Sequence, residues 1–166
     1  MPNWCMNNAT LVAPDKKSAT AFAAYLKEKE GADWMSYFLP VPESEAENWY
    51  SWNVTNWGTK WDCKADWKRK SQMFTLMFDS AWSPPIAMYE YLCEEGWSVE
   101  AFYYEPGMNF CGKYHDGNDD YYEIPSTSDG VLEEIPSDID ELYSISERMA
   151  EDEAFEDDNE GDCDDE

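Results

Sequence analysis

The pattern of apolar and polar positions switches repeatedly between a period of two and a period near 3.6. Strict alternation predicts half-buried strands over residues 61–67, 73–79 and 97–104, and a weaker alternation predicts another strand over 7–12. The polar run 68–72 is typical of a turn between the strands on either side of it. The alternation therefore predicts four strands, each with one buried face.

Helical spacing of apolar residues predicts two longer helices, over 16–30 and 84–95. The first follows Asp15, which can cap its N-terminus, and the second follows Ser83 and two prolines, a typical helix start. Each predicted helix is followed by a glycine, the residue that most often ends a helix. A short helix is also expected before Gly58, where tryptophans and asparagines recur at steps of three and four.

The later part of the chain predicts a hairpin and one more helix. Residues 110–114 and 120–123 can pair around a polar turn that contains His115. A helix is expected to begin at Ser137, and its apolar side consists of Ile139, Leu142, Tyr143 and Met149.

The order through residue 104 is β-α-(α)-β-β-α-β, which predicts an α+β fold of the ferredoxin-like, split βαβ type. Such a fold has one antiparallel sheet with its helices on one face, here followed by the extra hairpin and an acidic tail. We expect a ferredoxin-like domain over 1–123 and an acidic extension with a short amphipathic helix over 124–150. Residues 151–166 are expected to form an acidic tail that is disordered when free.

Charge is distributed unevenly in this chain of net charge −26. Residues 1–113 carry a net charge of −5, whereas residues 114–166 carry 22 acidic side chains against Arg148 alone, a net charge of −21. A surface of this sign repels phosphate backbones and anionic lipids. The charge therefore favours partners with a basic surface.

The five cysteines and the lack of a membrane segment indicate the reducing cytoplasm. Their number is odd, and no two have the spacing of a CxxC pair or a zinc site. No run approaches the roughly 20 apolar residues of a membrane span. The N-terminus also lacks the basic and apolar regions of a signal peptide.

Candidate catalytic chemistry is limited to the single histidine, His115, which lies beside Asp116 and near Cys111. On one strand, Cys111 and His115 are separated by about 13 Å, which is too far for an activated nucleophile. The acidic runs near residues 116 and 160 do not match the calcium-binding EF-hand loop. We therefore predict a non-enzymatic protein without catalytic residues, metal site or cofactor.

A mixture of aromatic and basic residues between Trp57 and Lys70 is typical of a surface that binds single-stranded nucleic acid. Alternation, however, places Trp61 and Trp67 on the side opposite Lys64 and Lys68, which indicates that these tryptophans belong to the core. The residues that would bind nucleic acid are Trp57, Lys60, Lys64, Lys68, Arg69 and Lys70.

Five separated motifs resemble those of one known family. In order, they are MPNWCMN, FLPVP, NWGTKWD, FDSAWSPP and YYEPGMNFCGKY. This series, within residues 1–123, resembles the YubB-like, ferredoxin-like family of plasmid and bacteriophage proteins. The resemblance implies a mobile-element protein in a bacterial cytoplasm, and it implies no catalytic residues.

The acidic C-terminal region has two interpretations. It can keep an aromatic-rich domain soluble, or it can mimic DNA and occupy the basic groove of a nucleic-acid-binding protein. The family resemblance favours the second, namely inhibition or redirection of a host protein such as a nucleic-acid-handling defence complex. A direct single-stranded nucleic-acid-binding protein is the alternative. The expected partner-binding residues are Asp138, Asp140, Glu141, Glu151, Asp152, Glu153, Glu156, Asp157 and Asp158.

Overall fold

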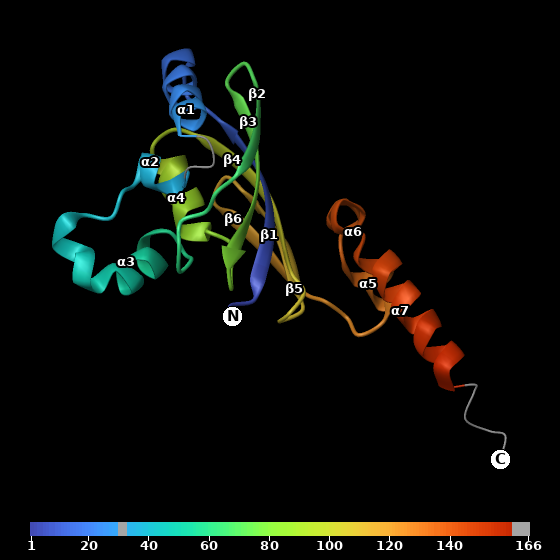
Figure 1. The fold of residues 1–166 in the computed structure, drawn as a ribbon. Helices are drawn as coiled ribbons and strands as arrows, with labels where there is room; N and C mark the ends of the chain where they lie inside the picture. Colours follow the sequence, from blue (N-terminus) through green and yellow to red (C-terminus); the bar gives the residue numbers. More distant parts are fainter. Residues whose placement is uncertain (30–32, 161–166) are drawn as a thin grey trace. The chain divides into compact units, whose positions relative to one another are not determined.

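The computed structural model describes residues 1–29 and 33–160, and in the last four of these it describes the backbone only. The chain divides into two compact units, Met1–Tyr121 and Tyr122–Glu166, which we call the first and second units. Figure 1 labels their helices and strands.

An open, six-stranded antiparallel sheet forms the framework of the first unit, with the strand order β2-β3-β1-β4-β5-β6. The strands are β1 (Trp4–Val12), β2 (Asp66–Lys70), β3 (Met73–Ala81), β4 (Ser98–Glu105), β5 (Phe110–His115) and β6 (Asn118–Glu123). Residue Ala9 of β1 pairs with Leu76 of β3 on one side and with Ala101 of β4 on the other. All three are buried, because directly paired residues point to the same face of the sheet.

Helices of the first unit cover this apolar face (Figure 1). The helical elements are α1 (Lys16–Glu28), α2 (Met35–Phe38), η1 (Glu43–Asn48), α3 (Trp49–Asn56) and α4 (Ile86–Glu94). The carboxylate of Asp15 accepts a hydrogen bond from the Ser18 N–H at 2.7 Å and caps α1, as the sequence predicts. Buried side chains of α1 and α4 belong to one core with β1, β3 and β4, so the prediction that both helices lie on one face is confirmed.

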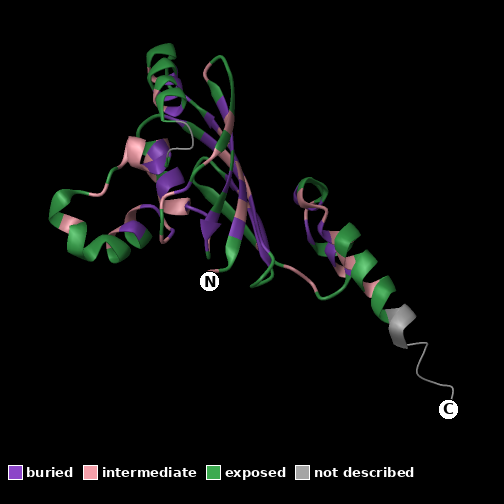
Figure 2. Ribbon diagram, viewed as in Figure 1, coloured by how far each residue is buried: buried purple, intermediate pink, exposed green. Residues whose placement is uncertain are grey.

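The core between sheet and helices is rich in aromatic rings. The ring of Phe22 on α1 lies 4.9 Å from that of Phe74 and 5.8 Å from that of Trp97, centroid to centroid. Trp34 and Tyr89 are also fully buried. Burying one large apolar side chain contributes about 1.5–3 kcal/mol, so this cluster stabilises the first unit strongly. Figure 2 shows buried residues along the strands and in the helices of the first unit.

The strand predicted over 61–67 is wrong in position. Residues 61–65 form no strand apart from an isolated bridge at Lys64, and β2 instead occupies Asp66–Lys70, most of which was predicted to be a turn. The carboxylate of Asp62 accepts hydrogen bonds of 2.9 and 2.7 Å from the first two N–H groups of α2. This side chain fixes the backbone before β2 in an irregular path, and periodicity cannot reveal such a contact.

The second unit contains three helices, α5 (Ser128–Glu134), α6 (Ser137–Tyr143) and α7 (Ile145–Glu160). Its buried apolar residues are Val131, Ile135, Ile139 and Ile145. The single helix predicted from Ser137 is divided by Ser144, which adopts a left-handed conformation with φ of 50°.

The C-terminal region also differs from the prediction of disorder from residue 151. Helix α7 continues to Glu160, because residues 147–156 are mostly good helix formers and Glu153 hydrogen-bonds to Ser128 of α5. Residues 161–166 lie outside the described part of the chain. Within the described residues, no helix is long and apolar enough to cross a membrane.

Candidate functional site

Acidic residues dominate the second unit. Residues 122–166 contain 19 acidic side chains and one basic side chain, that of Arg148. The guanidinium of Arg148 donates hydrogen bonds to the backbone carbonyls of Tyr143 and Ser144, at the junction of α6 and α7. The only basic side chain in the sequence of this unit therefore lies in the first turns of α7.

Two of the predicted partner-binding carboxylates serve the structure of the second unit. Asp140 is only 8% exposed and accepts hydrogen bonds from the backbone N–H (2.7 Å) and the hydroxyl (2.6 Å) of Ser146, at the start of α7. Glu153 accepts hydrogen bonds from the N–H and the hydroxyl of Ser128, which lower the pKa of its carboxyl group. These two residues hold the helices together, so their carboxylates are already engaged in hydrogen bonds within the unit.

The other predicted carboxylates with described side chains are exposed. They are Asp138, Glu141, Glu151, Asp152 and Glu156. Asp157 and Asp158 lie on α7 as well, but their side chains fall outside the description. The structure thus brings most of the predicted set onto α6 and α7.

Helix α7 has a charge density comparable to that of DNA. It carries eight acidic residues between Glu147 and Glu160. At a rise of 1.5 Å per residue these extend over about 20 Å, and after subtraction of the Arg148 charge this is about one net negative charge per 3 Å. Duplex DNA has one charge per about 1.7 Å and a single strand one per about 3.4 Å, so α7 lies between the two.

The high density of negative charge also destabilises α7 when no cationic partner is bound. Like charges lie four residues apart at Glu147 and Glu151 and at Asp152 and Glu156, where they repel. The acidic residues near Glu160 also lie at the negative end of the helix dipole. A cationic partner would relieve both effects.

The predicted nucleic-acid-binding residues do not share one surface, although Lys60 and Lys64 both lie near Trp4 and Trp61. Trp57 is 3% exposed, and its indole N–H donates a hydrogen bond of 3.0 Å to the carbonyl of Leu39 in the core. Lys68 pairs with Thr75 on the sheet face opposite the helices, whereas Arg69 pairs with the buried Phe74 on the helix side. The basic residues of β2 therefore point to different faces.

Sequence reasoning missed an exposed aromatic cluster, which we call the aromatic surface. It comprises Trp4, Trp49, Tyr50, Trp61 and Trp82, whose side chains are 39–47% exposed, and the side chain of Lys60. The Lys60 ammonium lies 4.4 Å from the ring centroid of Trp61, 5.0 Å from that of Trp82 and 5.7 Å from that of Tyr50. Trp4 and Trp61 are neighbours, with centroids 6.3 Å apart.

Hydrogen bonds position the loop that carries Lys60 and Trp61. The side-chain amide of Asn53 donates to the Lys60 carbonyl (2.8 Å), and the Thr59 hydroxyl donates to the carbonyl of Ala81 (3.0 Å). Trp82 has a φ of 69°, which is rare for a bulky residue, and its N–H donates to the carbonyl of Asn3. Such a conformation costs on the order of 1–3 kcal/mol and is found most often at functional sites.

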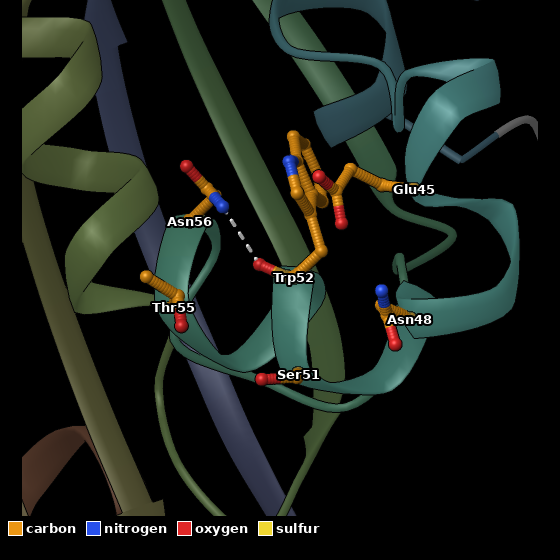
Figure 3. Close-up of a pocket in the computed structure, with 6 residues that line it drawn as sticks. All are labelled: Glu45, Asn48, Ser51, Trp52, Thr55 and Asn56. Atoms are coloured by element: carbon orange, nitrogen blue, oxygen red, sulfur yellow. Dashed lines mark hydrogen bonds between the residues drawn. The ribbon is translucent and has the colours of Figure 1, made fainter.

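Two pockets lie near these elements. A polar one of about 290 Å³ between η1 and α3 is lined by Glu45, Asn48, Ser51, Trp52, Thr55 and Asn56 (Figure 3). Its amides and hydroxyls surround a single carboxylate, so it offers hydrogen bonds but no acid–base pair. The other pocket, of about 390 Å³, adjoins the aromatic surface and is lined by Trp4, Asp33, Asp62, Cys63, Lys64 and Asp79.

The titratable groups of the second pocket have different environments. Burial raises the pKa of the Cys63 thiol, which keeps it protonated and unreactive. Burial also raises the pKa of Asp62, against its hydrogen bonds to Ser36 and neighbouring N–H groups. The carboxylates of Asp33 and Asp79 are exposed.

His115 is exposed at the end of β5, with its Nε2 atom 3.9 Å from a carboxylate oxygen of Glu100. Its neighbour Asp116 accepts hydrogen bonds from the Val99 N–H and from the hydroxyl of Ser98. Cys111 is buried and pairs with Tyr104. Among the described residues, no group of three or more His, Cys, Asp and Glu side chains could hold a metal ion.

No protein-family model, curated protein or solved structure matches this chain.

Proposed function

We propose that this is a non-enzymatic binding protein whose acidic second unit occupies the basic groove of a nucleic-acid-binding protein and thereby inhibits or redirects it. The observation that carries the proposal is the charge density of α7, which lies between those of single-stranded and duplex DNA. The exposed carboxylates of α6 and α7 would take the positions that phosphates occupy in the groove.

Electrostatics also explains how such a protein would compete with DNA. A concentrated negative field raises the association rate with a basic groove by about 10- to 1,000-fold. Contact with lysine and arginine side chains would remove the repulsion within α7, so binding would stabilise the helix. Asp140 and Glu153, which are engaged in hydrogen bonds within the unit, would preserve its shape during this exchange.

The biological setting that we propose follows from the resemblance to plasmid and bacteriophage proteins. Mobile elements gain from blocking host nucleases and defence complexes, which present basic grooves, in the bacterial cytoplasm. The order β2-β3-β1-β4 of the first four strands, with α1 and α4 on one face, supports a ferredoxin-like classification of the first unit. Direct binding of single-stranded nucleic acid has less support, because Trp57 is buried and the lysines of β2 point away from Arg69.

A charge-neutralised variant tests this proposal. The variant E151Q/D152N/E156Q removes three exposed carboxylates from α7. The control E90Q/E94Q/E95Q removes three exposed carboxylates from α4 and the residue that follows it. Each exposed ion pair between a carboxylate of α7 and a basic side chain of the partner contributes about 0.2–1 kcal/mol. The α7 variant, which loses three such carboxylates, should therefore bind its partner about tenfold more weakly.

The measurement is affinity capture from a bacterial lysate on immobilised full-length protein, followed by elution with duplex DNA. We expect the captured proteins to be nucleic-acid-binding proteins that DNA elutes. The α7 variant should retain these proteins poorly, whereas the α4 control should retain them. Equal retention by both variants, or capture that DNA does not affect, would contradict DNA mimicry.

A further inference from the structure

The aromatic surface of the first unit is a second candidate binding site, built from residues that the acidic helices do not include. Five large aromatic side chains are each exposed by 39–47%, although aromatic side chains of this size are usually buried. Tryptophan and tyrosine are also the residues most enriched at the energetic centres of protein interfaces. Their grouping on one surface, with the strained Trp82 among them, indicates a ligand.

Charge indicates the chemical class of that ligand. The pocket next to Trp4 contains the exposed carboxylates of Asp33 and Asp79, which form no hydrogen bond or ion pair with the side chains and backbone that the structure describes. Lys64 is the only basic residue among the described residues that line it. The first unit as a whole carries 18 acidic and 10 basic residues. A phosphate-bearing ligand is repelled by this arrangement, and a cationic one is attracted.

Lys60 shows how a cation can occupy the aromatic surface. Its ammonium lies within 6 Å of three ring centroids, which is the range of a cation–π interaction. A guanidinium is planar and more weakly hydrated than an ammonium, so it stacks more favourably on a tryptophan ring. It can also donate paired hydrogen bonds to a carboxylate such as that of Asp79.

We infer that the aromatic surface binds arginine side chains of a protein partner, which displace the Lys60 ammonium from the rings of Trp61 and Trp82. The bracing of the loop by Asn53 and Thr59 keeps these rings in place before binding, which lowers the entropic cost of association. This inference does not depend on the proposed role of the second unit, because it concerns other residues and another kind of contact.

The direction in which a Lys60 substitution changes the binding affinity distinguishes an arginine ligand from a nucleic acid. In Lys60→Met the competing internal cation is lost while the aliphatic stem remains. A short oligo-arginine peptide should therefore bind about fivefold more tightly, whereas a phosphate ligand would lose a contact and bind more weakly. Lys113→Met is the matched control, since Lys113 makes a cation–π contact with Phe102 elsewhere on the sheet. It removes the same charge without opening the aromatic surface.

The readout is the set of indole N–H resonances in NMR spectra of the full-length protein. The oligo-arginine peptide should shift the signals of Trp61 and Trp82, also in the E151Q/D152N/E156Q background, where binding to the second unit is reduced. Trp61→Ala should weaken this binding about tenfold. Tyr121→Ala, which removes an exposed ring of β6, should leave it unchanged.

Three results would overturn the inference. The first is that the indole signals do not respond to the arginine peptide. The second is that Lys60→Met binds the peptide with unchanged or weaker affinity. A tighter response to oligothymidylate than to the peptide would instead assign the surface to single-stranded nucleic acid. If Trp61→Ala does not fold, the comparison of Lys60→Met with Lys113→Met still decides between these outcomes.

Discussion

At the scale of single residues, several polar groups fix the backbone where periodic patterns end. Asp62 hydrogen-bonds to the first N–H groups of α2, and Ser83 donates a hydrogen bond of 2.7 Å to the carbonyl of Gly58. Gly58 itself adopts a φ of 86°, which favours glycine. These contacts determine where Lys60 and Trp61 lie, although none of these residues is part of the aromatic surface.

Gly58→Ala should destabilise the protein more than Gly117→Ala does. Both glycines have positive φ, so alanine costs about 1 kcal/mol or more at either position. At Gly58 a Cβ atom would also lie 3.1 Å from the Ile86 nitrogen and 3.2 Å from that of Ala87, whereas nothing lies within 4 Å at Gly117. We expect a further loss of about 1–2 kcal/mol in the free energy of unfolding for Gly58→Ala, measured by urea denaturation.

The paired variants separate the two effects, because only the steric contact differs between them. Gly58→Ala should also weaken binding of the arginine peptide, since the loop that carries Lys60 must move. Equal destabilisation by the two substitutions would show that the contact with Ile86 is relieved without cost.

At the scale of elements, the two kinds of helix in this protein are stabilised by different means. Helix α1 buries Phe22 and Leu26 in the core and has an N-cap. Helix α7 is anchored at its beginning by the hydrogen bonds of Ser146 to Asp140 and at its middle by Glu153, and its later residues carry repelling charges. Apolar spacing predicts the first kind of helix well, and it misses the second because the stabilising contacts are hydrogen bonds to another helix.

Salt should stabilise the later turns of α7. Repulsion between carboxylates four residues apart is screened as ionic strength rises, and the Debye length falls from about 30 Å at 0.01 M to about 3 Å at 1 M. Amide hydrogen exchange along residues 151–156 should therefore slow by several-fold in high salt. Helix α1, which carries charges of both signs, is the internal control and should change little. Equal protection of α7 at all salt concentrations would contradict the proposed self-repulsion.

At the scale of the whole molecule, the two units differ greatly in the size of their cores. The first has an extensive aromatic core, whereas in the 45-residue second unit the described side chains, those of residues 122–156, include four buried aliphatic ones. Domains of that size are marginally stable on their own. The chain therefore should not behave as a single cooperative unit.

Urea unfolding should show the second unit melting first. All nine tryptophans lie at or before Trp97, so tryptophan fluorescence reports the first unit alone. Helical circular dichroism reports both units. We expect part of the helical signal to disappear at lower urea concentration than the fluorescence change, which is the behaviour of a protein that departs from a two-state transition. Superimposable curves from the two probes would show instead that the units unfold together.

The sequence by itself determined most of the elements and the separation of charge. Alternation located β3 and β4, helical spacing located α1 and α4, and composition placed most of the negative charge after residue 113. The Asp15 cap of α1 was also predicted, whereas the predicted cap residue Ser83 does not cap α4 and instead donates a hydrogen bond to the Gly58 carbonyl. These features are local, because a strand or helix that lies against a core repeats its apolar residues at its own period. The acidic candidate site was predictable for the same reason, except that Asp140 and Glu153 turned inward to serine partners.

Only the tertiary structure decided the aromatic surface. Trp4, Tyr50, Trp61 and Trp82 come from four separate segments, and they meet because β1 pairs with β3 and the loop before β2 is held against Ala81. Alternation indicated that Trp61 is part of the core, yet the hydrogen bonds of Asp62 interrupt the strand there and leave the indole exposed. Periodicity reports how a segment meets the core, whereas register and side-chain capping decide which distant residues become neighbours.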